Sequence, residues 1–233
     1  MMVYEVSLII PTYNERDNVP LLVEELFRTV SSCGDIDLEI IIVDDNSPDG
    51  TGAVAEEMTQ KYPVRVIHRS GKLGLGSAVM EGFKASDRPV IGVMDADLSH
   101  DPVILPELIS SMSEYDIAIG SRFCEESRVE NWRIDRKITS LVGVFLARSL
   151  SHVADPLSGY FILRRSVLGS MSLTSPGYKI LLEILVKGKY SRVREVSFCF
   201  RTREHSVSKL DGREYCLFLR QLFVFYRMKL FGR

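Results

Sequence analysis

Two aspartates stand close together in the segment DADLSHDP, residues 95–102. Asp95 ends the apolar run PVIGVMD and Asp97 follows two positions later, so both carboxylates can point the same way from a strand end. Without compensation they would repel each other, and a hard divalent cation such as Mg²⁺ or Mn²⁺ would relieve that repulsion and bridge to diphosphate oxygens. The alternative is a loop with aspartates as helix caps, a role that suits Asp101 before Pro102. For Asp95 and Asp97 we favour the metal site.

The segment PTYNE, residues 11–15, offers groups that suit a nucleotide. Tyr13 provides a flat surface on which a base could stack, and Glu15 can accept hydrogen bonds from base or ribose groups. Pro11 stiffens the end of the preceding apolar run. On its own, the segment is equally consistent with a turn followed by a helix that starts near the glutamate.

The segment DDNSPDGT, residues 44–51, is a second acidic stretch that follows an apolar run. Asp44 or Asp45 could accept hydrogen bonds from a nucleobase or ribose edge, whereas Asp49 suits a helix cap. The spacing nearly matches a calcium-binding EF-hand loop, but such a loop follows a helix, and the preceding LEIIIV is β-branched. The pattern therefore favours a strand-to-helix turn.

The glycine-rich segment GKLGLGSA, residues 71–78, is not the GxGxxG dinucleotide fingerprint, and no other segment supplies it. This disfavours an enzyme that uses a nicotinamide cofactor. The glycines allow the backbone to approach a ligand, and Lys72 or Arg69 could neutralise phosphate. Close packing against another helix explains the glycines equally well.

Arginine is dense in the second half of the chain. Arg122 follows an apolar run, and further basic residues lie near Trp132 or in the polar stretch beyond residue 200: Arg133, Arg136, Arg201, Arg203 and Lys209. A phosphate monoester or diphosphate ligand would explain this recurrence, because the planar guanidinium binds phosphate bidentately. Ordinary surface charge is the alternative. The four histidines lack ligand spacing, and no Ser-His-Asp arrangement is present.

Apolar runs predict the elements that would bring these residues together. Strands are expected over 5–10, 38–44, 64–68, 89–95 and 116–120, and crossover helices over 17–32, 50–61, 74–86 and 102–113. Runs without polar alternation are typical of parallel strands covered on both faces. We predict an α/β fold with a mostly parallel, Rossmann-like sheet and helices on both faces, in which the five strand ends meet at one edge.

The second half of the sequence is more helical. A helix is expected over 135–153, a strand over 159–165, a helix over 178–187, a strand over 193–200 and a loop over 203–214. No linker separates a second domain, and 233 residues with 45% hydrophobic positions suffice for one globular core. Cys33, Cys124, Cys199 and Cys216 are too widely spaced for a zinc ribbon or a disulfide framework and indicate reduced thiols.

Charge is distributed unevenly along the chain. Residues 1–184 hold 17 Lys and Arg against 27 Asp and Glu, whereas residues 185–233 hold 12 against 4. The basic, apolar stretch 214–231 predicts an amphipathic helix at anionic lipid or phosphate, and nucleic acid is the weaker alternative. No signal peptide is expected, and no apolar run approaches the roughly 20 residues that span a bilayer.

Taken in order, the motifs resemble a known family over nearly the whole chain. They are IIPTYNE, VDDNSPDGT, KLGLGSA, MDADLSHDP, IGSRF, VENW followed by RK, DPLSGYF, GYKILLEIL and VSKL. This ordered set resembles the inverting GT-A glycosyltransferases of family 2, and among them the dolichyl-phosphate (polyprenyl-phosphate) mannosyltransferases.

The resemblance implies roles for individual residues. A pocket for the guanosine of GDP-mannose is implied at Pro11, Tyr13, Glu15 and Asp44, with Asp45 beside it, and Lys72 and Ala96 join the nucleotide-sugar group. Asp95 and Asp97 resemble the metal-binding DxD, and Ser99 stands where some members have a glutamine ligand. Arg122, Arg136 and Ser140 resemble the acceptor-phosphate group, and Arg203 with Lys209 resembles a mobile basic loop that closes over the site. The catalytic set implied is Asp97, Arg122 and Arg136.

The resemblance also implies a reaction. Mannose would pass from GDP-mannose to dolichyl or polyprenyl phosphate with inversion, helped by Mg²⁺ or Mn²⁺, and no general base is needed because the acceptor oxygen is already anionic. Residues 1–125 would bind the nucleotide sugar, and residues 126–233 would face the acceptor and the cytoplasmic membrane surface, with a small membrane subunit as a possible anchor. Two alternatives stay open: a polyprenyl-phosphate glucosyltransferase or other transferase using a UDP-sugar, and an inactive nucleotide-sugar-binding adaptor.

Overall fold

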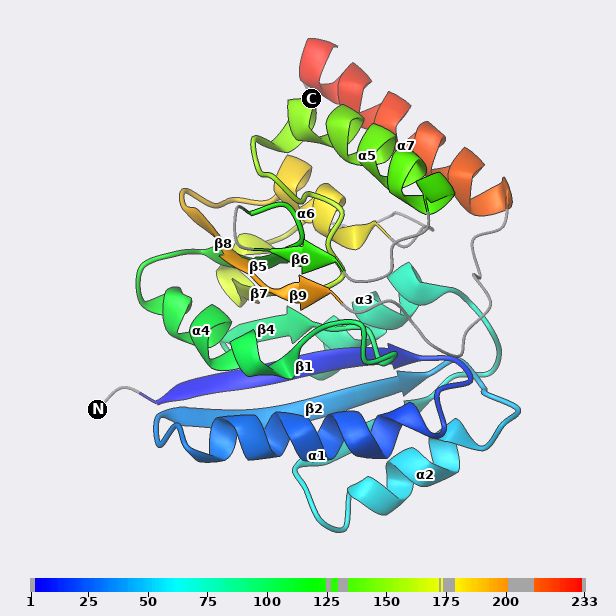
Figure 1. Cartoon of the computed structure of the whole chain (residues 1–233), viewed down its shortest axis with the longest axis vertical. Coiled ribbons are helices and arrows are strands. Elements are labelled where there is room, and N and C mark those ends of the chain that lie inside the picture. Colours follow the sequence, from blue (N-terminus) through cyan, green and yellow to red (C-terminus); the bar gives the residue numbers. More distant parts are fainter. Residues whose placement is uncertain are drawn as a thin grey trace.

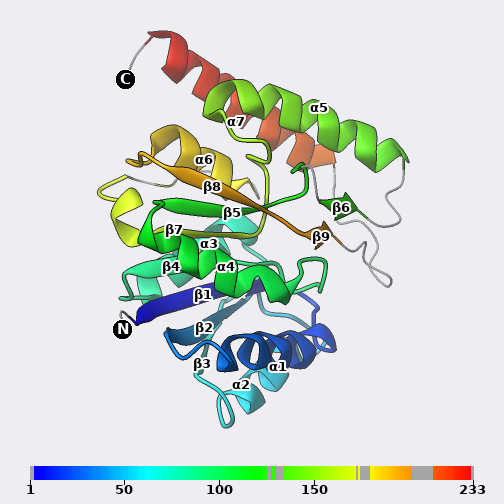
Figure 2. The ribbon, with the colours of Figure 1, turned by 60° about the vertical axis from the view of Figure 1, so that its left-hand side comes forward.

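The computed structural model describes residues 3–124, 127–129, 134–171, 173, 179–200 and 212–231, with the backbone alone at 128–129, 134–140 and 212–215. Its centre is a seven-stranded sheet with the order β3-β2-β1-β4-β7-β5-β8 (Figures 1 and 2). The strands are β1 (Tyr4–Thr12), β2 (Ile36–Asp44), β3 (Val64–His68), β4 (Val90–Val93), β5 (Ile117–Ser121), β7 (Phe161–Arg164) and β8 (Val193–Ser197). All run parallel except β7, which lies antiparallel between β4 and β5.

The central strands are buried on both faces, which is why their sequences are apolar without alternation. In β1, Leu8 and Ile10 face one hydrophobic cluster, and Ile9 between them faces another. The first cluster packs under α1 (Asn18–Ser31), α2 (Thr51–Met58) and α4 (Leu105–Ser110); the second packs under α3 (Leu75–Ala85) and α6 (Ile180–Lys187). The predicted α/β sheet with helices on both faces is confirmed.

A pair of helices forms a further layer at one end of the molecule. Helices α5 (Ile134–Ser151) and α7 (Gly212–Phe231) lie side by side in both views and enclose a third apolar cluster with α6 (Figures 1 and 2). Their outer faces leave large apolar side chains exposed: Leu141, Val142, Phe145, Leu219, Phe223, Val224, Leu230 and Phe231. Among the described residues, no helix combines the length and the apolar character needed to cross a bilayer.

Several boundaries differ from the sequence predictions. The single helix expected over 102–113 consists of η1 (Pro102–Ile104), α4 and η2 (Ser111–Ser113). The strand expected over 193–200 breaks at Phe198 into β8 and β9 (Cys199–Phe200), and β9 pairs in parallel with β6 (Arg128–Val129). The loop expected over 203–214 is wrong at its end, because α7 begins at Gly212; residues 203–211 lie outside the described part. These breaks follow tertiary contacts that hydrophobic periodicity does not report.

Candidate active site

The polar segments found in the sequence leave the sheet at one edge. In register, Thr12 of β1 lies beside Asp44 of β2, which lies beside His68 of β3. Strand β4, which precedes Asp95, is parallel to β1, and β5, which precedes Arg122, has the same direction because both flank the antiparallel β7. The carboxyl ends of these strands therefore share one edge, where ligands bind in open α/β sheets.

The loops after β1 and β2 are fastened to each other. The buried Asp44 carboxylate accepts hydrogen bonds from the Ser47 amide (3.0 Å) and hydroxyl (2.5 Å) and from the Thr12 hydroxyl (3.1 Å). The Glu15 amide donates to the Thr51 hydroxyl at 2.9 Å. Asp49 accepts the Thr51 amide at 3.0 Å, but it is not the helix cap that the sequence suggests, because the N-cap of α2 is Gly50, one residue later. These bonds hold the predicted nucleotide segments in one fixed arrangement.

Asp45 has other partners than Asp44 and Asp49. It is buried, forms an ion pair with Arg69 and accepts the amide of Gly74 at 2.9 Å. Gly74 has φ 98°, a conformation that favours glycine. Arg69 also binds Glu81 at 3.0 Å and is buried, so the hypothesis that Arg69 neutralises phosphate is wrong: it is a structural cation that holds the glycine-rich loop.

Lys72 is the basic residue of that loop that reaches the nucleotide segment. Its Nζ lies 4.1 Å from the centroid of the Tyr13 ring, a cation–π geometry. The neighbouring Glu15 carboxylate accepts the Asn18 side-chain amide at 2.7 Å. Tyr13, Glu15 and Lys72 therefore come from two loops and lie beside the Asp44 turn.

The two aspartates expected to bind metal differ in environment. The Asp95 side chain is 27% exposed, whereas Asp97 is 8% exposed and its Oδ1 accepts the Ser99 amide (3.1 Å) and hydroxyl (2.6 Å). Leu98, between Asp97 and Ser99, has φ 60°, an uncommon conformation for a leucine. Ser99 therefore orients Asp97, and Ala96 is buried between the two aspartates.

These residues suit a hard divalent cation. Carboxylate and hydroxyl oxygens are its preferred ligands, and room for the Asp95 carboxylate exists because residue 159 is glycine: a Cβ there would lie 2.8 Å from Asp95 Oδ2. Within the described ranges no cluster of three or more His, Cys, Asp or Glu residues could hold a metal by itself. A cation here would complete its shell with ligand and water oxygens, as Mg²⁺ does beside a bound phosphate.

His100 adjoins this pair and was not singled out by the sequence. Its Nδ1 lies 4.0 Å from Asp95 Oδ2, and its ring packs against Tyr160, Phe198 and Phe200 with centroids 5.4 to 5.7 Å apart. Burial lowers the pKa of His100, although Asp95 and Asp97 oppose that shift. The residue lies inside the DADLSHDP motif, so its position, though not its burial, was visible in the sequence.

Arg122 is held by a carboxylate that the sequence analysis did not assign a function. Arg122 Nε and Nη2 donate to Asp155 at 2.7 and 2.8 Å, and the Arg122 amide donates to it at 3.1 Å. Burial alone would raise the pKa of Asp155, but the Arg122 charge and hydrogen bonds outweigh it and lower that pKa. Asp155 belongs to DPLSGYF, one of the motifs that carry the resemblance.

A second buried cation lies near this ion pair. Lys179 Nζ donates to the Leu157 carbonyl at 3.3 Å, and burial, followed by the charge of Arg122, lowers the pKa of Lys179 to about 8. Lys179 lies in the motif GYKILLEIL, but no sequence pattern predicts a role for it.

Several predicted site residues cannot be compared. Arg136 and Ser140 belong to the backbone of α5, but their side chains lie outside the described part of the structure. Arg133, Arg201, Arg203 and Lys209 lie outside it altogether. Their roles stay predictions.

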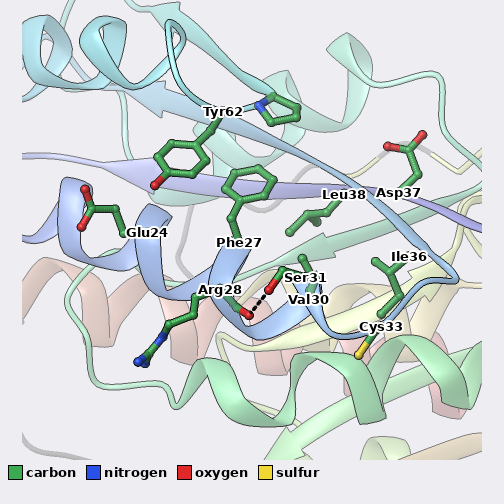
Figure 3. A pocket seen from close by; sticks show the side chains of 11 residues that line it. Glu24, Phe27, Arg28, Val30, Ser31, Cys33, Ile36, Asp37, Leu38 and Tyr62 are labelled. Atoms are coloured by element: carbon green, nitrogen blue, oxygen red, sulfur yellow. Dashed lines mark hydrogen bonds between the residues drawn. The ribbon is translucent and has the colours of Figure 1, made fainter.

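A pocket of about 560 Å³ lies elsewhere in the molecule (Figure 3). It is lined by the last turns of α1 and the first residues of β2, at the amino end of that strand, and includes the stacked rings of Phe27 and Tyr62, with centroids 4.9 Å apart. The carboxyl edge of the sheet, not this pocket, carries the acidic and basic side chains described above.

Comparison with known proteins supports an enzyme of one family. A family model described as glycosyl transferase family 2 matches residues 7–180. The chain is 45% identical over 225 residues to a dolichol-phosphate mannosyltransferase of Pyrococcus furiosus, with 94% of this chain and 63% of that protein covered. It is 34% identical over 238 residues to a dolichol-phosphate mannosyltransferase of Saccharomyces cerevisiae, with 98% of this chain and 89% of that protein covered. The chain thus spans somewhat less than two thirds of the Pyrococcus relative.

Solved structures share the fold at lower identity. Glucosyl-3-phosphoglycerate synthase from Mycobacterium tuberculosis, crystallised with Mn²⁺, UDP-glucose and phosphoglyceric acid, gives a TM-score of 0.64 at 20% identity, covering 97% of this chain and 79% of that one. Mannosyl-3-phosphoglycerate synthase from Rubrobacter xylanophilus gives 0.67 at 18% identity, covering 99% and 75%. The predicted GT-A fold is confirmed, and the Mycobacterium tuberculosis enzyme of this fold was crystallised with Mn²⁺. The family model matches most of the chain, and the relatives at 45% and at 34% identity carry the same name. This chain therefore belongs to glycosyl transferase family 2.

Proposed function

We propose that the protein transfers mannose from GDP-mannose to dolichyl or polyprenyl phosphate with inversion, releasing GDP and forming polyprenyl-phosphate-mannose. The observation that carries the proposal is the similarity, over nearly the whole chain, to proteins named dolichol-phosphate mannosyltransferase. The arrangement of carboxylates and arginine at one sheet edge supports it, because both ligands are anionic: carboxylates can hold a divalent cation that neutralises the diphosphate of the donor, and arginine can bind the acceptor phosphate directly.

In this proposal the donor half of the site comes from the first loops. Tyr13, Glu15 and Asp44 would bind the guanosine, with Pro11 and Asp45 supporting the loops that hold them, and Lys72 would face phosphate from its position over Tyr13. Asp95 and Asp97 would hold Mg²⁺ or Mn²⁺, with Ala96 between them and Ser99 fixing Asp97. When bound, such a cation stabilises the negative charge that develops on a leaving diphosphate.

The acceptor half would be basic. Arg122, fixed by Asp155, would orient the acceptor phosphate, and Arg136, Ser140, Arg203 and Lys209 would join it from residues whose side chains lie outside the described part. A phosphate monoester is largely ionised at neutral pH, so its oxygen can attack the anomeric carbon without a side-chain base. The protein therefore contributes orientation and positive charge rather than proton transfer.

The lipid acceptor needs a face that meets a membrane, and we propose the outer surface of α5 and α7 for it. Phe145, Phe223 and Phe231 are 67 to 81% exposed there, and Arg220, Arg227 and Lys229 lie exposed along α7. Exposed aromatic groups with cations around them favour an interface with anionic lipid. A peripheral position on the cytoplasmic face, with or without a membrane subunit, follows from this proposal.

The test is transfer of labelled mannose from GDP-mannose to a polyprenyl phosphate in detergent. Reactions with Mg²⁺, with Mn²⁺, with chelator and with UDP-glucose in place of GDP-mannose run in parallel. Metal-dependent mannolipid is expected. Product from UDP-glucose alone would move the donor to a UDP-sugar, and lipid product from neither donor, with bound nucleotide still detectable, would favour the nucleotide-sugar-binding adaptor.

A further inference from the structure

We infer that the five residues Asp155–Gly159, between α5 and β7, position both halves of the site at once. One end of this segment fixes Arg122, and the other end makes room for Asp95. The positions of Arg122 and Asp95 therefore both depend on one short stretch of chain. The inference rests on the proposed function, since it assigns Asp155 and Gly159 as positioning residues for that reaction.

Asp155 determines where Arg122 can point. It is fully buried, and both of its oxygens are engaged by the guanidinium, with a third bond from the Arg122 amide. Asp155 is itself placed by Glu195 of β8, which accepts the amides of Ala154 and Asp155 at 2.7 and 2.9 Å. A bidentate pair of this kind fixes the plane of the guanidinium as well as its position.

Gly159 determines where Asp95 can lie. A Cβ at residue 159 would lie 2.8 Å from Asp95 Oδ2 and 3.2 Å from both Cγ and Oδ1, and no other group is among its nearest neighbours. The backbone angle of Gly159 is not in the left-handed region, so conformational freedom does not explain the glycine. The three atoms nearest to that position all belong to the Asp95 carboxylate.

The middle of the segment is anchored to the sheet. The Ser158 hydroxyl donates to the carbonyl of Gly120 in β5 at 2.7 Å and accepts the amide of Tyr160 at 3.1 Å. The Leu157 carbonyl accepts Lys179 Nζ at 3.3 Å. The two ends are therefore joined by a short, anchored stretch of chain, and we expect it to fix the Arg122 and Asp95 side chains relative to each other on the strand ends that carry them.

A fixed separation matters for the proposed reaction. The acceptor oxygen and the anomeric carbon must approach to about 3 to 3.5 Å, and an error of about 1 Å can cost on the order of a hundredfold in rate. Arg122 would hold the acceptor and Asp95 the cation on the donor, so the segment between them would set that approach.

The first experiment uses Gly159→Ala. The added methyl group displaces only the end of one side chain, so we expect the fold to persist and Mn²⁺ affinity, measured by electron paramagnetic resonance with GDP and without acceptor, to fall about tenfold to a hundredfold. Gly34→Ala is the matched control, because a Cβ there meets nothing within 4 Å. The KM for polyprenyl phosphate should change little in Gly159→Ala.

The second experiment uses Asp155→Asn, with Asp87→Asn at an exposed position as control. Loss of the charge loosens Arg122, so the KM for polyprenyl phosphate should rise on the order of tenfold or more while Mn²⁺ affinity stays unchanged. Thermal melts accompany both variants. If Asp155→Asn does not fold, the Mn²⁺ affinity of Gly159→Ala is the measurement that tests the inference.

The two variants should thus show opposite patterns. Wild-type Mn²⁺ affinity in Gly159→Ala, or equal KM increases for donor and acceptor in Asp155→Asn, would overturn the inference. If the wild-type protein makes no mannolipid, the proposed function fails, and the Mn²⁺ measurement still tests Gly159 because it needs no turnover.

Discussion

Four buried aspartates at the carboxyl edge of the sheet are each held by several donors. Asp44 is held by Ser47 and Thr12, Asp45 by Arg69 and Gly74, Asp97 by Ser99, and Asp155 by Arg122. Buried carboxylates are costly unless they are hydrogen-bonded or paired, so four of them at one sheet edge mark a site where negative charge is required. The role of each differs because its partner differs.

Asp97→Ala should abolish transfer and leave the protein folded. Asp97 lies in the loop after β4, outside the strands, and its substitution removes its hydrogen bonds with Ser99. Several kcal/mol of transition-state stabilisation correspond to a rate loss of about a hundredfold or more. The measurement is kcat with GDP-mannose at saturating Mn²⁺, beside Asp87→Ala as an exposed control. Unchanged turnover in Asp97→Ala would remove Asp97 from the metal site.

Lys179 should make stability depend on pH. Its pKa is lowered from 10.5 to about 8, so between these values the unfolded chain binds a proton that the folded protein does not. Stability from this group therefore rises with pH from about 8 to 10.5 and is flat below that window. Urea midpoints of the wild type and of Lys179→Met, measured at pH 7 and pH 9.5, test this. All other groups titrate in both proteins, so an increase in stability between the two pH values that only the wild type shows belongs to Lys179. Parallel changes in the two proteins would contradict it.

Strand β4 is short, but it sets the position of the metal-binding loop. Its four residues are buried between β1 and β7, and the register places Gly92 opposite Leu8 on one side and Ile162 on the other. A strand of four residues forms few backbone hydrogen bonds with its neighbours, so its position depends on close packing of its side chains. The glycine allows that packing.

Gly92→Ala should destabilise the sheet. Its Cβ would fall inside van der Waals contact with Ile162 Cδ1 and lie 3.1 Å from both Leu8 Cδ1 and the Phe161 carbonyl oxygen, all of them in the core. Overpacking of this kind costs about 1 to 3 kcal/mol. The free energy of unfolding in urea measures it, with Gly34→Ala as control. A loss no larger than that of the control would show that β4 and β7 can separate without cost.

At the scale of the whole molecule, the charged residues of the candidate site and the exposed apolar surface lie in different places. The sheet edge gathers the charged loops, whereas α5 and α7 form an outer layer whose exposed apolar side chains lie at one end of the protein (Figures 1 and 2). An exposed patch of this kind is uncommon on a soluble surface and marks an interaction site. In the proposed function, the outer surface of α5 and α7 contacts the membrane while the sheet edge binds the nucleotide sugar.

Phe145→Ser with Phe223→Ser should weaken binding to vesicles that contain anionic lipid. Each exposed ring would contribute about 1.5 to 3 kcal/mol on burial, so the pair should lower vesicle affinity by about a hundredfold or more. Sedimentation with vesicles measures it, and Leu21→Ser, 58% exposed on α1 at the far side of the molecule, is the control. Transfer to a short, detergent-soluble acceptor should be unaffected. Equal binding by the double variant and the control would exclude this face.

The sequence by itself determined the first five strands of a mostly parallel sheet and the family, because buried parallel strands appear in a sequence as unbroken apolar runs and the motifs follow them directly. Asp95, Asp97, Tyr13 and Glu15 were found for that reason. Only the tertiary structure decided that Arg69 is a structural cation, that Asp155 holds Arg122, and that Gly159 gives space to Asp95. These are contacts between residues 24 to 64 positions apart, and a local pattern carries no information about which side chains meet across the fold.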